Sequence, residues 1–280
     1  MVKVSPSEFF LENQDFEKLV GIAHAMADAA REPVLRHFRS HALTADSKLE
    51  SGFDPVTVAD RESEAAMRAM LAKHRPEDGI LGEEEADLTG TSGLTWVLDP
   101  IDGTRAFISG APVFGVLIAL NDGARPILGV IDQPYIDERF IGVLGGPSPG
   151  AVLLRGEDRR VLTTRSRPLA DATLLSTFPE VGRAHDRRGF EAVRDRVKLT
   201  RYGLDCYGYA LVAMGQVDLV IEAGLHAYDI QGPKALIEAA GGIVTNWRGG
   251  SCDDGGQVLA AGSKALHGEV LELLQPFADE

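Results

Sequence analysis

The sequence predicts a mixed α and β protein in which helices pack on sheets. Two helix patterns open the chain, short β-rich runs broken by glycine, proline and aspartate follow, and helix-like and strand-like segments then alternate to the end. Alternation of this kind implies layers, because each element must bury its apolar face against another element. We therefore expect the α/β class, built as an α+β layered sandwich.

Two amphipathic helices are expected near the amino terminus. In residues 15–38 the apolar positions recur at helical spacing, at Leu19, Val20, Ile22, Ala23, Met26, Ala27 and Ala30. Residues 60–73 repeat the pattern, and Pro76 sets the limit of this second helix. Both helices therefore offer one apolar face to a core.

Strand patterns begin at Leu94, with β-rich runs at 95–98, 115–120, 127–132 and 139–144. Residues 145–150, GGPSPG, form the clearest break in the chain. We place a boundary there, between an N-terminal α+β domain (1–150) with most metal ligands and a C-terminal α/β domain (151–280) with Asp229 and the specificity residues. A hairpin turn, with 151–154 as its return strand, explains the same residues equally well. Beyond it we expect helices at 205–214, 230–240 and 264–274 and strands at 217–222, 242–245 and 258–262.

The composition excludes several classes of function. The 280 residues include 28 Lys and Arg against 42 Asp and Glu, a formal net charge of −14. Nucleic-acid binding needs a basic stripe, so we expect no nucleic-acid partner. No run approaches the roughly 18 apolar residues of a membrane span, and residues 1–15 lack the apolar core of a signal peptide, so we expect no membrane partner. Two distant cysteines suit a reducing compartment, and the expected localisation is cytoplasmic.

The strongest functional signal is the segment 96–104, WVLDPIDGT. A buried strand would deliver Asp99 at its carboxyl end, where ligand sites of α/β sheets collect. Pro100 would force a turn that returns Asp102 beside Asp99, and two carboxylates so close repel unless a divalent cation joins them. The N–H groups of the next two residues could hold an anion. The structural alternative is a plain Asp-Pro turn followed by an Asp-Gly turn.

Three further acids fall at the ends of expected elements, and each has a structural alternative. Glu83 follows the short apolar step 80–81, but could belong with Glu85 to a solvated acidic run. Asp60 and Asp229 stand where helices begin, so each could simply cap its helix. Each acid alone is better explained as structural. Together with the two motif aspartates, they offer the hard oxygen ligands that suit Mg²⁺ and a phosphate substrate.

Competing catalytic patterns fit poorly. Residues 146–150, GPSPG, match the G-x-S-x-G of a nucleophile elbow, but Pro149 disfavours the helix that must follow the serine. The seven histidines show no zinc-ligand spacing, and we interpret His226, the one near a candidate site, as a packed or surface residue. Walker and dinucleotide-binding loops are absent from the sequence. The motif aspartates are three residues apart, which is a poor fit for an aspartyl-phosphate nucleophile.

This pattern resembles the inositol monophosphatase superfamily of Mg²⁺-dependent phosphatases, over nearly the whole chain and in order. The matching segments are Asp60, Gly82-Glu83-Glu84, Asp99-Pro100-Ile101-Asp102-Gly103-Thr104 and Tyr228-Asp229. The combination of DPIDGT with an upstream GEE is very specific. The family usually has Trp where Tyr228 stands and Ala-Ala-Gly at 231–233, where this chain has Gln-Gly-Pro. These departures concern the support of the last ligand and not the ligand itself.

The resemblance implies a sugar-phosphatase-like fold of alternating helix and sheet layers, with two or three Mg²⁺ ions per site in a cleft between domains. The first ion would be held by Glu83, Asp99 and the Ile101 carbonyl. The second would be held by Asp99, Asp102 and Asp229. The catalytic residues, which serve a metal-activated water without a covalent intermediate, would be Asp60, Thr104 and Glu83. Substrate and phosphate contacts would come from Gly103, Thr104, Arg105, Asp205 and Glu222.

Within the superfamily the chain is most similar to the histidinol-phosphate phosphatase branch. The supporting segments are RAFISG at 105–110, GVIDQP at 129–134 with Glu138-Arg139, and YGLDCY at 202–207. Asp205 falls where inositol-type members usually carry a small residue, and Glu222 where the family's acid contacts the leaving portion of the substrate. An acid pair fits an amine and an imidazole, whereas a polyol needs only neutral hydrogen bonds. Asp205 could alternatively be the N-cap of the following helix.

The expected function is therefore hydrolysis of a small phosphorylated substrate, histidinol phosphate, in histidine biosynthesis, and we expect a homodimer. One alternative is another small phosphomonoester, such as inositol 1-phosphate or a nucleotide 3′-phosphate. Another is a catalytically silent binding or regulatory protein on the same fold. The intact acids and Thr104 speak against the silent protein.

Overall fold

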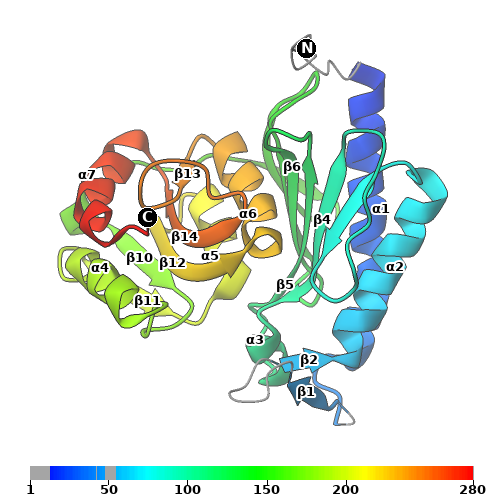
Figure 1. The fold of residues 1–280 in the computed structure, drawn as a ribbon, viewed down its shortest axis with the longest axis horizontal. Helices are drawn as coiled ribbons and strands as arrows, with labels where there is room; N and C mark the ends of the chain where they lie inside the picture. Colours follow the sequence, from blue (N-terminus) through cyan, green and yellow to red (C-terminus); the bar gives the residue numbers. More distant parts are fainter. Residues whose placement is uncertain (1–12, 42, 48–54, 280) are drawn as a thin grey trace, which may run out of the picture.

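The computed structural model describes residues 13–41, 43–47 and 55–279. Helices and sheets alternate in layers (Figure 1). Helices α1 (Asn13–His37) and α2 (Val58–His74) cover one face of a seven-stranded sheet, and α5 (Asp205–Ala213) and α6 (Ala227–Ala239) lie between it and a five-stranded sheet. Helices α4 (Ala184–Arg194) and α7 (Lys264–Leu274) cover the outer face of the five-stranded sheet. The predicted layered α/β class is confirmed.

The seven-stranded sheet follows the order of the chain, and its neighbouring strands are antiparallel except for the first pair. Its strands are β3 (Gly79–Gly82), β4 (Thr95–Asp102), β5 (Gly115–Asn121), β6 (Pro126–Gln133), β7 (Glu138–Val143), β8 (Gly150–Arg155) and β9 (Asp158–Leu162). The five-stranded sheet has the order β11-β10-β12-β14-β13. Its strands are β10 (Thr173–Ser176), β11 (Leu199–Tyr202), β12 (Leu219–His226), β13 (Ile243–Thr245) and β14 (Gly255–Ala261).

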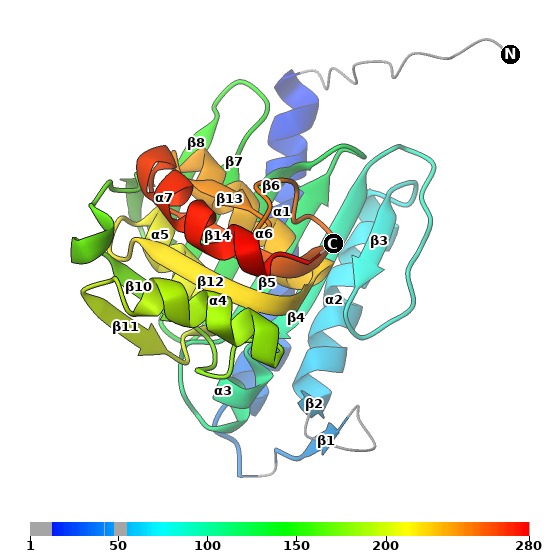
Figure 2. The ribbon, with the colours of Figure 1, turned by 60° about the vertical axis from the view of Figure 1, so that its left-hand side comes forward.

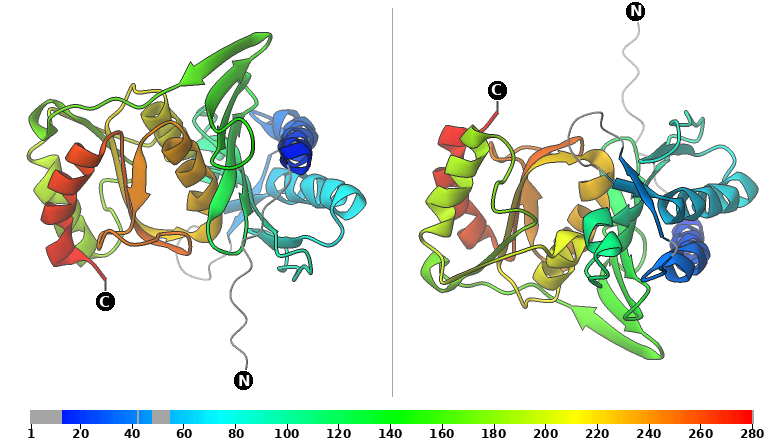
Figure 3. Two further views of the ribbon diagram at one scale, coloured as in Figure 1. Left: turned by 90° about the horizontal axis from the view of Figure 1, so that it is seen from above. Right: turned by 90° about the horizontal axis from the view of Figure 1, so that it is seen from below.

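Short elements complete the described chain. A two-stranded sheet joins β1 (Ala45–Ser47) to β2 (Pro55–Thr57), and α3 (Thr104–Ile108) follows β4 directly. Two single-turn 3₁₀ helices are η1 (Leu169–Asp171) and η2 (Gln275–Phe277). Figure 2 shows α4 and α7 lying across the five-stranded sheet, and Figure 3 views the layers from their two ends.

The segment 145–150 is a hairpin turn within the seven-stranded sheet. Val143 pairs with Gly150 across it, and β8 and β9 continue the sheet to Leu162. The hairpin interpretation is confirmed, because the same Gly-Pro-Ser residues that mark a linker also form turns. The chain leaves this sheet only after Leu162, so the predicted division at residue 150 does not coincide with the division between the sheets. A division into separately folding domains stays a prediction.

The predicted amphipathic helices correspond to α1 and α2, whereas α4 and the β10–β11 pair were not predicted. The apolar stripe of α4 is narrow, since its buried positions include only Phe190 and Val193 among large apolar residues. Charged residues occupy most of its remaining surface and hide the helical period. No described helix combines the length and the apolar composition needed to cross a bilayer. Residues 1–12, on which the prediction of no signal peptide largely depends, lie outside the described residues.

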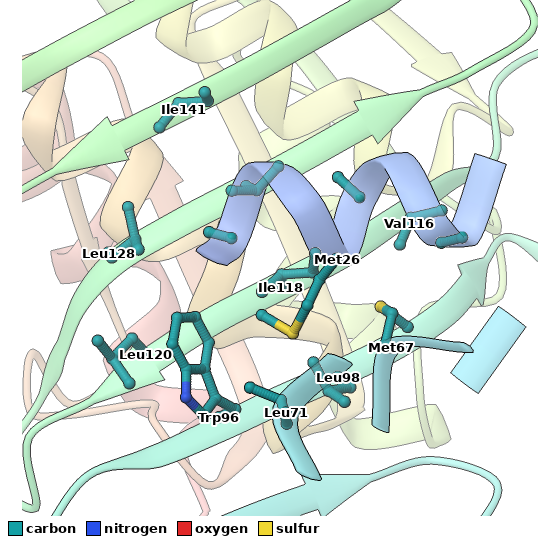
Figure 4. Close-up of a cluster of buried hydrophobic side chains, with 14 of the residues drawn as sticks. Met26, Met67, Leu71, Trp96, Leu98, Val116, Ile118, Leu120, Leu128 and Ile141 are labelled. Atoms are coloured by element: carbon teal, nitrogen blue, oxygen red, sulfur yellow. The ribbon is translucent and has the colours of Figure 1, made fainter. Parts of the chain in front are cut away.

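Apolar side chains fill the space between neighbouring layers. On β5, Val116, Ile118 and Leu120 face α1 and α2 (Figure 4), whereas Leu117 belongs to the cluster on the opposite face. This alternation is the period of two that a strand buried on both faces requires. The two faces of the sheet therefore hold α1 with α2 on one side and α6 on the other.

Helix α6 lies directly against the seven-stranded sheet because glycines face it. A Cβ added to Gly129 of β6 would lie 2.1 Å from the Gly232 carbonyl oxygen, and one added to Gly142 of β7 would lie 2.3 Å from the Cα of Leu236. Only glycine permits so close an approach. The contact fixes α6, whose amino terminus carries Asp229.

Candidate active site

A cleft of about 390 Å³ lies between the end of β4 with α3 and the facing segments of α5, β12 and α6. Most residues predicted for the site line it, namely Glu83, Asp102, Gly103, Thr104, Arg105, Asp205, Glu222 and Asp229. The other predicted residues, Asp60, Asp99 and Ile101, are buried beside them. A second hollow of similar volume, between α1 and the β7–β9 strands, is mainly apolar and contains none of the predicted residues.

Asp99, Asp102 and Asp229 form the centre of the site. One carboxylate oxygen from each lies within 4.8 Å of the others. Burial raises the pKa of Asp99 well above its usual range, and the charge of Glu83 raises it further. Burial also raises the pKa of Asp102, with the charge of Asp205 as the next cause. Such a cluster is stabilised by a cation, and its hard oxygen donors fit Mg²⁺.

An irregularity in β4 brings the two motif aspartates together. The β4–β5 ladder is regular up to the pair Asp99–Leu117 and resumes at Asp102–Gly115. Pro100 has no N–H to give to the ladder, and the Ile101 N–H donates to Asp99 Oδ1 at 3.0 Å. The prediction that the strand ends at Asp99 was wrong, because it continues through this bulge to Asp102. The bulge has the effect that was expected of a turn.

Asp60 and Asp229 each serve a helix and the site at once. At the start of α2, the N–H and Oγ1 of Thr57 donate to Asp60 Oδ2 at 2.7 and 2.6 Å. At the start of α6, the N–H of His226 donates to Asp229 Oδ2 at 2.6 Å. Asp60 Oδ1 lies 3.5 Å from Thr104 Oγ1, while Asp229 belongs to the acid cluster. Both acids take part in helix capping, and this does not exclude a second role, because a carboxylate has two oxygens.

Thr104 and Asp60 are arranged as a hydroxyl beside a base. Thr104 Oγ1 lies 3.1 Å from the Ile101 carbonyl oxygen, so its single proton can go to that oxygen or to Asp60. Burial raises the pKa of Asp60 to about 6, despite the hydrogen bonds from Thr57 that oppose the shift. A carboxylate with this pKa is suited to proton transfer near neutral pH.

The loop that carries Glu83 is held by Glu64, a buried residue of α2. Glu64 accepts the N–H groups of Glu84 and Glu85 at 2.8 and 3.1 Å. Arg68 donates to Glu64 Oε1 at 2.8 Å and to the Glu85 carbonyl oxygen at 2.9 Å. Glu85 itself is exposed, as predicted. The loop is thus fixed at Glu84 and Glu85, next to the predicted ligand.

At the far end of the cleft, Glu222 is buried, and neighbouring groups donate hydrogen bonds to both of its carboxylate oxygens. The N–H and Oγ1 of Thr177 donate to Glu222 Oε1 at 2.6 and 2.9 Å, and Ser176 Oγ donates to Oε2 at 3.1 Å. Burial nevertheless raises the pKa of Glu222 to about 7. Much of its hydrogen-bonding capacity is therefore already used within the protein.

Asp205 does not occupy the N-cap position, so its structural alternative was wrong. Asp205 is the first residue of α5, and Leu204 takes the cap position. Its φ is 46°, a left-handed conformation that costs a non-glycine residue about 1–3 kcal/mol. A Cβ added to Gly103 would lie 2.9 Å from the Cβ of Asp205, so the two are closely packed. Burial raises the pKa of Asp205 to about 6, and the charge of Arg105 opposes this.

Aromatic rings form the remaining walls. The Arg105 guanidinium lies 4.9 Å from the centroid of the Phe178 ring, and Phe178 is 42% exposed. The rings of His226 and Tyr228 stack at 5.1 Å. His226 is exposed, as predicted, and also lines the cleft.

Comparisons with known proteins agree with this geometry. A model of the inositol monophosphatase family matches residues 15–277. The chain is 40% identical to the bifunctional phosphatase IMPL2, chloroplastic, of Arabidopsis thaliana, over 97% of this chain and 78% of that protein. It is 34% identical to the histidinol-phosphatase of Mycobacterium tuberculosis, over 90% of this chain and 96% of that protein. A solved inositol monophosphatase from Zymomonas mobilis superimposes with a TM-score of 0.81 at 40% identity, covering 93% of this chain and 98% of that one.

Proposed function

Because the chain belongs to the inositol monophosphatase family and is a phosphoric monoester hydrolase, we propose that it hydrolyses histidinol phosphate to histidinol and phosphate, in histidine biosynthesis. The family is metal-dependent and acts on small phosphorylated substrates. Similarity to a histidinol-phosphatase supports the choice of substrate, as does the chemistry at the far end of the cleft.

The observation that carries this choice is the Asp205 carboxylate. Its backbone conformation is strained, and its side chain lines the cleft without a hydrogen bond from any described residue. The charge of Arg105 only partly offsets the effect of burial on its pKa. A carboxylate in this state gains most from a cationic donor, which both pairs its charge and fills its lone pairs. Glu222 lies close enough for the charge of Asp205 to raise its pKa further, so one cation would relieve both acids. Histidinol phosphate brings such a cation in its amine.

At the end of the cleft that carries Asp99, Asp102 and Asp229, we propose that two or three Mg²⁺ ions bind. The first would be held by Glu83, Asp99 and the Ile101 carbonyl, and the second by Asp99, Asp102 and Asp229. When bound, Mg²⁺ supplies Lewis-acid stabilisation of the charge that develops on the phosphoryl oxygens. Thr104 would orient the attacking water, and Asp60 would take its proton. The N–H groups of Gly103 and Thr104, with Arg105, would hold the phosphate.

The proposal is tested by measuring phosphate release from histidinol phosphate, inositol 1-phosphate and adenosine 3′,5′-bisphosphate with Mg²⁺ present. We expect the highest kcat/KM on histidinol phosphate. Asp205→Asn should lower that value by ~10–150-fold, since a hydrogen bond to a charged group contributes roughly 1.5–3 kcal/mol. The same variant should keep its activity on p-nitrophenyl phosphate, which has no cation. A wild type that prefers inositol 1-phosphate, with kinetics insensitive to Asp205, would overturn the choice of substrate.

Inositol 1-phosphate is the second candidate. It is favoured by the similarity to the inositol monophosphatase of Zymomonas mobilis and by the state of Glu222, which already accepts bonds from neutral groups and could accept them from a polyol. Under this alternative, Glu222→Ala should matter more than any change at Asp205.

We further propose that the protein acts as a cytoplasmic homodimer. Its two cysteines form neither a zinc-ligand pattern nor a disulfide pattern, which supports a cytoplasmic location. Sedimentation equilibrium at micromolar concentration tests the dimer, and a monomer there would contradict it.

A further inference from the structure

The first turn of α5 directs three successive residues to different parts of the molecule. The Asp205 side chain faces Gly103 in the cleft, and the Cys206 N–H donates to Asp102 Oδ2 at 2.6 Å. Tyr207 instead reaches β7, where its Oη donates to Glu138 Oε2 at 2.6 Å. Tyr207 thus holds the turn through a contact with β7, whereas Asp205 faces the cleft.

The Tyr207–Glu138 pair is partly buried, and Arg155 lies 3.9 Å from Glu138 Oε1. The side chain of Glu138 is only 13% exposed, and the Tyr207 ring packs edge-on against Phe140 with centroids 5.9 Å apart. Burial raises the pKa of Tyr207 above its usual range, and the bond to Glu138 raises it further, so the hydroxyl stays protonated as the donor. Tyr209, two residues on in the same helix, buries its hydroxyl without a hydrogen-bond partner among the described residues. The bond of Tyr207 is therefore a specific feature and not a general consequence of a tyrosine buried in α5.

The pair ties α5 to the sheet that also carries the acid cluster. Glu138 begins β7, and Asp102 ends β4 in the same seven-stranded sheet. Asp205 is held in a left-handed conformation against Gly103, so a small displacement of the turn changes where its carboxylate lies. Both members of the pair fall in segments that mark the histidinol-phosphatase resemblance in the sequence, at 138–139 and 202–207.

We propose that Tyr207 and Glu138 are positioning residues that set the Asp205 carboxylate to meet the cationic group of the substrate. This inference rests on the proposed function. A hydrogen bond outside the cleft would then control the discrimination between cationic and neutral leaving groups, because neither Tyr207 nor Glu138 lines the cleft.

The test compares Tyr207→Phe with Tyr209→Phe, a matched loss of one hydroxyl from the same helix. Tyr207→Phe should lower kcat/KM for histidinol phosphate about tenfold, mostly through KM, because misplacing a positioned group by a fraction of an ångström has effects of this order. Its kcat/KM for p-nitrophenyl phosphate should change by less than about twofold, and the inhibition constant of free histidinol should rise in parallel with KM. Tyr209→Phe should leave all three values unchanged.

Variants at Glu138 complete the experiment. Glu138→Gln keeps an oxygen acceptor and should retain most of the selectivity, whereas Glu138→Ala should reproduce Tyr207→Phe. The double variant Tyr207→Phe with Glu138→Ala should be no worse than either single change, since both remove the same bond. If Tyr207→Phe loses activity equally on both substrates, or not at all, the positioning role is overturned. If Asp205→Asn instead leaves kcat/KM for histidinol phosphate unchanged, the proposed function itself has failed.

Discussion

The carboxylates at the two ends of the cleft have different surroundings. At the metal end, buried Asp99 and half-buried Asp102 lie beside each other and beside further acids, and their pKa values are raised by burial and by repulsion between the acids. At the far end, Glu222 is also buried, yet the chain itself gives it hydrogen bonds from Thr177 and Ser176. Within the described part of the chain, burial and neighbouring acids are the main causes that raise the pKa values of Asp99 and Asp102, so a bound cation would stabilise this end. Asp205 lies between the two ends, because it packs against Gly103 and its charge raises the pKa values of both Asp102 and Glu222.

The largest effect on activity is expected at the metal end, from a change at Asp99. Asp99→Asn should lower kcat/KM by at least ~10³-fold, because Lewis-acid stabilisation is worth several kcal/mol and each 1.4 kcal/mol is a decade. Phosphate release at saturating Mg²⁺ measures the loss. In the presence of a chelator the same variant should unfold at a higher temperature than the wild type, because one repelling charge has been removed. A variant that is inactive and also less stable without metal would point to a structural role for Asp99.

The second prediction concerns the hydroxyl beside Asp60. Thr104→Ala should lower kcat about 10²-fold with little change in KM, since proton transfer in the transition state is worth ~10²–10⁴-fold. Thr104→Ser should restore much of the rate, because it returns the hydroxyl. An increase confined to KM would assign Thr104 to phosphate binding and leave water activation to Asp60 alone.

The third prediction separates the two ends by pH. The raised pKa values of Asp99, Asp102 and Asp60 mean that the metal-free folded protein binds more protons than the unfolded chain, so these groups favour folding at low pH and lose this contribution as pH rises through the folded values. Asp205 and Glu222, whose pKa values are also raised, act in the same direction. His24 and His267, whose pKa values are lowered by burial, act in the opposite direction. The histidines lie outside the acid cluster, so they contribute equally to the Tm with Mg²⁺ and to the Tm with chelator. Their contribution therefore cancels in the difference between the two values.

This Tm difference should be small at pH 5.5, where protons compete with the ion, and large at pH 7.5. Differential scanning calorimetry at the two pH values measures it. A difference that is equal at both would mean that the acids of the metal end are ionised throughout, and would remove the contrast between the two ends.

Residues next to one another in sequence were the most predictable part of the site. The Asp99–Asp102 spacing and the helix-initial position of Asp229 led to the acid cluster, although a bulge and not a turn brings the motif aspartates together. The role of Glu64 could have been suspected from its four-residue spacing from Asp60, which places both residues on one side of α2. No sequence pattern indicated Thr177 and Phe178. They reach the cleft only through the pairing of β10 with β12, and single-sequence patterns do not specify such long-range pairing.

The smallest expected effect lies at Glu222. Glu222→Gln is isosteric and can still accept from Thr177, so it should fold normally. Because the pKa of Glu222 is raised to about 7, roughly nine-tenths of this group is neutral at pH 6 and roughly nine-tenths is ionised at pH 8. The advantage of the wild type over Glu222→Gln in kcat/KM for histidinol phosphate should therefore grow several-fold between these pH values, since kcat/KM reports ionisations of the free enzyme. The substrate amine remains charged throughout this range, and p-nitrophenyl phosphate should show no such growth. An advantage that stays flat with pH would mean that Glu222 acts only as an acceptor of neutral hydrogen bonds, which would favour a polyol in the cleft.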